Sequence, residues 1–176
     1  MQKPPHVTET YLQPGELWFG DENTRIRTIL GSCVAITLWH PRLRIGGMCH
    51  YMLPTRARKQ GADLDGRYGD EAMALLIRHI DAADCRLQDF EVKLFGGGRM
   101  FQHAYCAGSS CASQQVHDRN IEVARTMAAQ HGLPIKAEHL GGHGHRQVIL
   151  DVWSGHAWLK HTPLAEQARC PLKEVA

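Results

Sequence analysis

The sequence predicts an α+β fold, a single domain of layered mixed β-sheet with flanking helices. Its 176 residues are the length of one domain, and no internal repeat or linker divides them. Several strand patterns precede the first helix pattern and several more follow the second, with one strand between the two helices. Because strands and helices do not alternate regularly, the pattern does not favour a parallel βαβ fold.

The ends of the chain are predicted to lie outside the domain. Residues 1–14 are mostly polar and contain several prolines, so they predict a flexible N-terminal arm that ends at the Pro14-Gly15 turn. The domain is then expected to span residues 15–162. Residues 163–176 are expected to form a C-terminal tail.

Strands are predicted throughout the first third of the domain. Apolar and β-branched residues alternate with polar ones there, and Pro41 and Pro54 mark a tight connection and a strand end. The segment 55–67 carries charged residues and glycines with few apolar side chains, which predicts a mobile surface loop. The strands expected before this loop are 16–20, 25–30, 34–39 and 45–53.

Two helices are predicted from the spacing of their apolar residues. The first spans 70–83 with Asp70 as its N-cap, and the second spans 118–131 before Gly132 and Pro134. The segment 100–115 has no clear pattern. The remaining strands are expected at 90–95, 135–140, 147–153 and 156–160.

Composition narrows the possible functions. The net charge is only +2 and the basic residues are dispersed, which argues against a nucleic-acid binder. No run approaches the roughly 20 apolar residues of a membrane span. The N-terminus lacks the apolar region of a signal peptide, so we expect a cytoplasmic protein whose six cysteines are reduced.

Cys33 and His50 are the first candidates for catalysis. Cys33 lies between two apolar runs, after Gly31, and His50 follows on the next strand but one along the chain. A nearby imidazole can activate a thiol and return the proton to a leaving group. The alternative is a small buried cysteine and a hydrogen-bonded core histidine, and spacing alone favours that alternative.

Other motifs have simpler explanations. Residues 96–98 are three glycines without the remaining residues of a phosphate-binding loop, which predicts a turn with close backbone approach. Cys106 and Cys111 are five residues apart, which is outside the usual spacing of zinc ligands. A segment rich in histidines also lacks carboxylate or thiolate partners at ligand spacing, so we predict no metal and no cofactor. The histidines concerned are His139, His143 and His145.

Several motifs resemble one family along nearly the whole chain, from about residue 16 to 160. These are Leu-Gly-Ser-Cys at 30–33, His-Tyr-Met-Leu-Pro at 50–54, and further motifs in matching order and spacing. The chain thus resembles the chemoreceptor glutamine deamidases called CheD. The further motifs are 67–70, 93–97, 118–120, 138–142 and 151–160.

The resemblance implies a fold similar to that of CheD and the cytotoxic-necrotizing-factor-like cysteine hydrolases. It also implies a protein-glutamine glutaminase that converts glutamines of methyl-accepting chemotaxis receptors to glutamate, releases ammonia, and in some organisms also hydrolyses receptor glutamyl methyl esters. In this family Cys33 corresponds to the nucleophile and His50 to the general base and acid.

The family's third catalytic residue is a threonine upstream of the cysteine that orients the histidine. An ungapped alignment puts Arg27 at that position with Thr28 beside it, and we predict Thr28; Arg27 or a backbone carbonyl are the alternatives. The backbone N–H of Cys33 and the side chain of Ser32 are the candidates for stabilising an oxyanion.

The implied partners are the cytoplasmic helices of chemotaxis receptors and, in some bacteria, a CheC-type phosphatase. No nucleic acid and no membrane insertion are expected. One alternative function is a non-catalytic module that binds the receptor or the phosphatase. The other is a redox or metal protein that uses the surplus cysteines.

Overall fold

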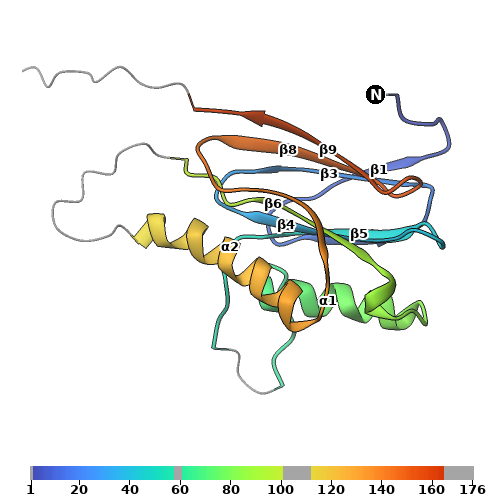
Figure 1. Cartoon of the computed structure of the whole chain (residues 1–176), viewed down its shortest axis with the longest axis horizontal. Helices are drawn as coiled ribbons and strands as arrows, with labels where there is room; N and C mark the ends of the chain where they lie inside the picture. The colour runs from blue at the N-terminus through green and yellow to red at the C-terminus, as the bar shows by residue number, and fades with distance from the viewer. Residues whose placement is uncertain (1, 58–60, 101–111, 165–176) are drawn as a thin grey trace, which may run out of the picture.

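The computed structural model describes residues 2–57, 61–100 and 112–164. Figure 1 shows three layers, namely a four-stranded sheet, a five-stranded sheet and a pair of helices. The expected α+β domain is therefore present, with its strands divided between two mixed sheets. No helix in the described part of the chain is long and apolar enough to cross a membrane.

The four-stranded sheet has the order β1-β3-β8-β9. The strand β1 pairs in parallel with β3, whereas β8 pairs antiparallel with both β3 and β9. The bounds are β1 (Thr8–Tyr11), β3 (Thr24–Leu30), β8 (His145–Asp151) and β9 (His156–Thr162).

The strand β1 corrects the prediction of a flexible arm over residues 1–14. Val7 and Leu12, which flank this strand, are buried, and Leu12 packs between the two sheets. The local sequence is polar because most side chains of β1 face outward, and its backbone partner lies in β3, far along the chain. Residues 165–176, most of the predicted tail, lie outside the described residues.

The five-stranded sheet has the order β2-β5-β4-β6-β7. Its central strand β4 is buried on both faces, and β6 and β7 pair in parallel while the other neighbours are antiparallel. All five strands were predicted within a few residues. The bounds are β2 (Leu17–Gly20), β4 (Val34–His40), β5 (Ile45–Tyr51), β6 (Glu91–Gly96) and β7 (Ile135–Leu140).

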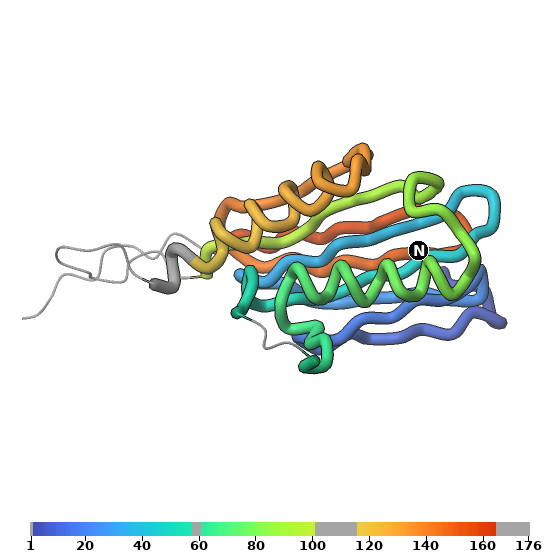
Figure 2. Tube along the Cα trace, turned by 90° about the horizontal axis from the view of Figure 1, so that it is seen from below, coloured from blue at the N-terminus to red at the C-terminus, as the bar shows by residue number. Residues whose placement is uncertain are grey.

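Both helices cover the outer face of the five-stranded sheet (Figure 2). They are α1 (Gly69–Ala82) and α2 (Ala112–Gln130), and a short 3-10 helix spans Leu87–Asp89. The second helix begins six residues earlier than predicted. Asp70 is not the N-cap of α1, because Tyr68 holds that position without a side-chain bond and the Asp70 carboxylate accepts a hydrogen bond from the Glu71 N–H.

The strand β4 separates two apolar cores. Val34, Ile36 and Leu38 face the helices, whereas Ala35 faces the other sheet. Alternation along an antiparallel pair places directly opposed side chains on the same face. His50 of β5 lies opposite Ala35, so its side chain also faces the space between the sheets.

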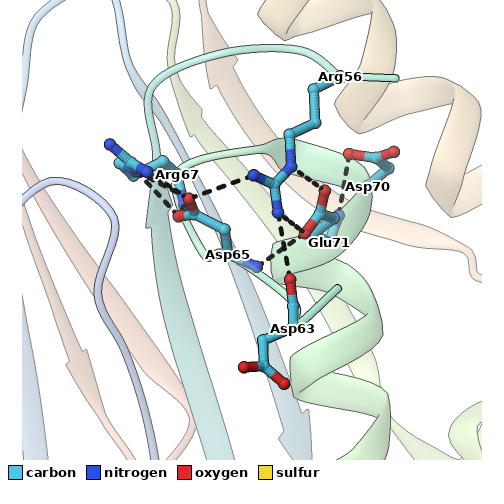
Figure 3. A network of polar contacts seen from close by, with 6 residues as sticks. All are labelled: Arg56, Asp63, Asp65, Arg67, Asp70 and Glu71. Carbon is cyan, nitrogen blue, oxygen red and sulfur yellow. Dashed lines mark hydrogen bonds and ion pairs between the residues drawn. The ribbon is translucent and has the colours of Figure 1, made fainter. Parts of the chain in front are cut away.

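Ion pairs and hydrogen bonds of charged side chains hold the segment between β5 and α1 in place (Figure 3). Glu71, buried at the start of α1, accepts hydrogen bonds from the Arg56 guanidinium and from the Asp65 N–H, and Arg67 pairs with Asp65. The sequence predicted a mobile loop with few packing partners over 55–67. These bonds instead tie its described parts to α1, a long-range effect that the charged sequence does not reveal.

Candidate active site

Cys33 lies where the chain passes from one sheet to the other, between β3 and β4. Three glycines pass close to this crossover: the Gly97 N–H donates to the Cys33 carbonyl (2.8 Å) and the Gly98 N–H to the Gly31 carbonyl (2.7 Å). A Cβ on Gly96 would lie 2.2 Å from the Cys33 carbonyl oxygen, so only glycine fits there. The predicted close backbone approach at residues 96–98 is confirmed.

The pairing of β4 with β5 brings Cys33 and His50 to the same face. Ala35 lies opposite His50, and Cys33 precedes Ala35 by two residues. The partly buried Cys33 packs against the core between the sheets, as Ala35 does. Cys33 lies one residue beyond the ladder, so continued alternation makes it a diagonal neighbour of His50, a relation with a typical spacing of about 7–8 Å.

Thr28 contacts the ring of His50. The Thr28 Oγ1 lies 2.8 Å from His50 Nδ1 and donates its own proton to the Leu12 carbonyl oxygen, also at 2.8 Å. Because this hydroxyl proton is used, the bond to the ring assigns the proton to Nδ1. His50 Nε2 is then an unprotonated acceptor, and it is buried without a hydrogen-bond partner in residues 2–57, 61–100 and 112–164.

Arg27, the alternative to Thr28, lies elsewhere. Its guanidinium forms an ion pair with Glu9 (3.0 Å) and lies over the Tyr11 ring, on the other face of β3. The Leu12 carbonyl, which follows β1, accepts the Thr28 hydroxyl proton and also acts on the ring as a backbone hydrogen-bond partner that raises the pKa of His50. Of the two side chains considered for orienting His50, Thr28 contacts the ring and Arg27 does not, and the Leu12 backbone carbonyl lies beside the same contact.

Burial favours the neutral forms of both Cys33 and His50. Loss of water around the imidazole lowers the pKa of His50 to about 4, so the ring is an unprotonated base at neutral pH. Burial also raises the pKa of the Cys33 thiol, although its own backbone N–H acts in the opposite direction. The resting pair is therefore a thiol beside a neutral imidazole.

Ser32 occupies the same crossover, next to Cys33. It is half-buried, and its carbonyl accepts a hydrogen bond from the side chain of Asn120 in α2 (3.1 Å). The same Asn120 amide donates to the Met52 carbonyl (2.9 Å). Sequence reasoning assigned Asn120 no role, although it belongs to the motif at 118–120, which was a signal that could have identified it.

The histidine-rich segment does not form a metal site in the described residues, which contain no group of three candidate ligands. His139 Nδ1 accepts a hydrogen bond from Arg146 Nε (2.9 Å), and its ring packs against His161. Cys106 and Cys111, the cysteines considered for metal binding, lie outside the described residues.

Comparisons with known proteins agree on one family. The profile described as "CheD chemotactic sensory transduction" matches residues 52–161. A protein of Pseudomonas syringae pv. tomato named "Probable chemoreceptor glutamine deamidase CheD" is 49% identical over 93% of this chain and 95% of its own length. Proteins with corresponding names from Pseudomonas savastanoi pv. phaseolicola (50%; 93% and 90% covered) and Dechloromonas aromatica (47%; 89% and 89%) are similarly close.

Proposed function

This chain belongs to the CheD family, and from that premise we propose that it is a chemoreceptor glutamine deamidase with Cys33 as nucleophile and His50 as general base and acid. One observation carries the assignment of these residues. Thr28 holds the protonated Nδ1 of His50, which leaves an unpaired acceptor, Nε2, on the face that Cys33 shares. A base of this kind is what a neutral thiol needs in order to become a nucleophile.

The first half-reaction forms a thioester. His50 Nε2 takes the proton of the Cys33 thiol while the sulfur attacks the side-chain carbonyl carbon of the substrate glutamine. The carbonyl oxygen becomes an oxyanion, for which we assign the Cys33 N–H and Ser32 as donors. When the carbonyl re-forms, the C–N bond breaks, His50 returns the proton to nitrogen, and ammonia leaves.

The second half-reaction releases glutamate. His50 Nε2 removes a proton from water, the resulting hydroxide attacks the thioester carbon, and the C–S bond breaks. The sulfur leaves as a thiolate, which the protonated His50 neutralises. The Cys33 N–H lowers the pKa of its own thiol against the effect of burial, so it favours negative charge on the departing sulfur.

The same steps apply to glutamyl methyl esters, with methanol in place of ammonia. We include receptor methylesterase activity in the proposal on that chemical ground. The proposed substrates are the cytoplasmic helices of chemoreceptors, and a CheC-type phosphatase is a further proposed partner. Met52 and Leu53, which are 37% and 36% exposed just after His50, support docking of a protein segment beside the site.

Replacement of Cys33 by alanine tests the proposal. Cys33→Ala removes the nucleophile and should abolish deamidation of a receptor cytoplasmic fragment, measured by mass spectrometry as the mass gain of glutamine converted to glutamate. The circular dichroism spectrum should be unchanged, because Cys33 is only partly buried and its thiol contributes little to core packing. Wild-type deamidation by Cys33→Ala would refute the catalytic assignment.

A second measurement separates catalysis from binding alone. Selective alkylation of Cys33 by iodoacetamide, with a rate that depends on His50, is expected of a catalytic pair. If the wild-type protein binds the receptor fragment but converts no glutamine, and its Cys33 alkylates at the same rate in His50→Gln, the non-catalytic binding module is the correct function.

A further inference from the structure

Asn120 lies at the point where the β4–β5 pairing ends. The last pair of this ladder is Val34 with Tyr51, so Cys33 and Met52 follow it without ladder pairing. Asn120 itself is fully buried in α2, and its backbone carbonyl accepts a hydrogen bond from the Tyr51 hydroxyl (2.5 Å). The helix is thus fixed directly beside the end of the ladder.

The Asn120 amide joins the two strands beyond this point. Its Nδ2 donates to the Ser32 carbonyl at 3.1 Å and to the Met52 carbonyl at 2.9 Å, which uses both of its protons. Ser32 immediately precedes Cys33, and Met52 follows His50 by two residues. A single planar group therefore fixes the separation of the two backbone segments that carry the thiol and the imidazole.

Core packing alone does not explain why an asparagine is buried at position 120. The Asn120 Oδ1 is buried and has no hydrogen-bond partner in the described part of the chain. A buried polar atom without a partner is unfavourable, and an apolar side chain of similar volume would avoid that cost. The two donated bonds are the contribution that an apolar residue could not make.

We infer that Asn120 is a positioning residue of the deamidation reaction, which sets the distance between Cys33 Sγ and His50 Nε2 by holding the Ser32 and Met52 carbonyls together. This inference rests on the proposed function of Cys33 and His50. Asn120 touches neither the substrate nor the reacting atoms. Its effect passes through the two backbone segments.

Asn120→Asp is the sharpest variant, because it keeps the shape but removes both donors and sets a carboxylate oxygen against two carbonyls. Misplacement of reacting groups by about 1 Å costs roughly 100-fold in rate, so kcat on a receptor fragment should fall by that order while KM changes less than about twofold. Asn120→Ala removes the same bonds without adding charge, and should lose kcat in the same way.

Tyr51→Phe is the matched control. It removes the other hydrogen bond that fixes this helix residue, the one from Tyr51 to the Asn120 backbone, but leaves the amide and its two bonds in place. Its kcat should stay within about threefold of the wild-type value, because the amide that joins the Ser32 and Met52 carbonyls is unchanged. Equal losses in Tyr51→Phe and Asn120→Ala would show that helix docking, not strand positioning, is what matters.

The readout that a merely structural role would not change is the coupling between thiol and imidazole. In the wild-type protein, the rate of Cys33 alkylation should depend on His50, whereas in Asn120→Ala the substitution His50→Gln should have little further effect. Full coupling in Asn120→Ala, or an unchanged kcat, would overturn the inference. If the wild-type protein itself shows neither coupling nor deamidation, the proposed function fails instead.

Discussion

Two buried polar clusters lie along β3, and they differ in whether every buried polar side-chain atom has a hydrogen-bond partner. Near its start, Arg25 makes two hydrogen bonds to Asp151 of β8 (2.7 and 3.1 Å), and Trp158 Nε1 donates to the same carboxylate (3.0 Å). Neither Arg25 nor Asp151 has a buried side-chain polar atom without a partner in the described residues. Near the end of the strand, Thr28 and His50 form a cluster that leaves His50 Nε2 unpaired.

This difference separates a structural cluster from a functional one. A buried ion pair whose hydrogen bonds are all made holds two strands in register, and it offers nothing to a substrate. An unpaired acceptor beside a thiol has a free energy cost that the folded protein alone does not recover. The free energy of unfolding should therefore depend mainly on the first cluster, and the deamidation rate on the second.

The largest effect on stability is expected from Asp151→Ala. This substitution removes the carboxylate from the buried Arg25 guanidinium, and breaking a buried pair in this way lowers the free energy of unfolding by about 3–5 kcal/mol. Urea denaturation measures the change. The deamidation rate of the folded fraction should remain close to that of the wild-type protein, and a loss of activity beyond the loss of folded protein would contradict the distinction.

The next effect is a pH dependence of stability from His50. Its pKa in the folded protein is lowered to about 4, below the unfolded value of about 6.5, so the unfolded chain binds the extra proton first as the pH falls. The stabilisation is fully present above pH 6.5 and is lost as the pH falls towards 4, a change of roughly 3 kcal/mol.

Denaturant unfolding between pH 7.5 and 4.5 measures this dependence, with His50→Gln as the control. The glutamine side chain does not titrate in this range, so the difference in pH dependence between the two proteins isolates His50. Identical pH dependence of the wild-type protein and His50→Gln would mean that the imidazole is not buried in its neutral form.

The smallest effect on stability is expected from Thr28→Val. Valine has nearly the shape of threonine but removes the hydroxyl that contacts both the Leu12 carbonyl and His50 Nδ1, which costs about 1–3 kcal/mol. Activity should fall by more than stability alone explains, because the ring loses the bond that fixes its tautomer. Thr28→Ser keeps the hydroxyl and should retain most of the rate; equal losses in both variants would exclude the orienting role.

Much of the fold followed from local patterns. Strand alternation and helical spacing located β2 to β9 and both helices within a few residues, apart from the start of α2, because these periodicities depend on neighbours along the chain. The exceptions depended on distant partners. The strand β1 exists because it pairs with β3, and the segment after β5 is held by Glu71 of α1.

By itself, the sequence determined that Cys33 and His50 were candidates and that their motifs resembled one family. Only the tertiary structure distinguished Thr28 from Arg27, because adjacent strand residues face opposite ways and the packing of two sheets decides which of them meets His50. Asn120 likewise contacts the crossover only after α2 packs on the sheet. Local periodicity depends on neighbouring residues and can be read from the sequence, whereas contacts between layers form only when the layers pack together.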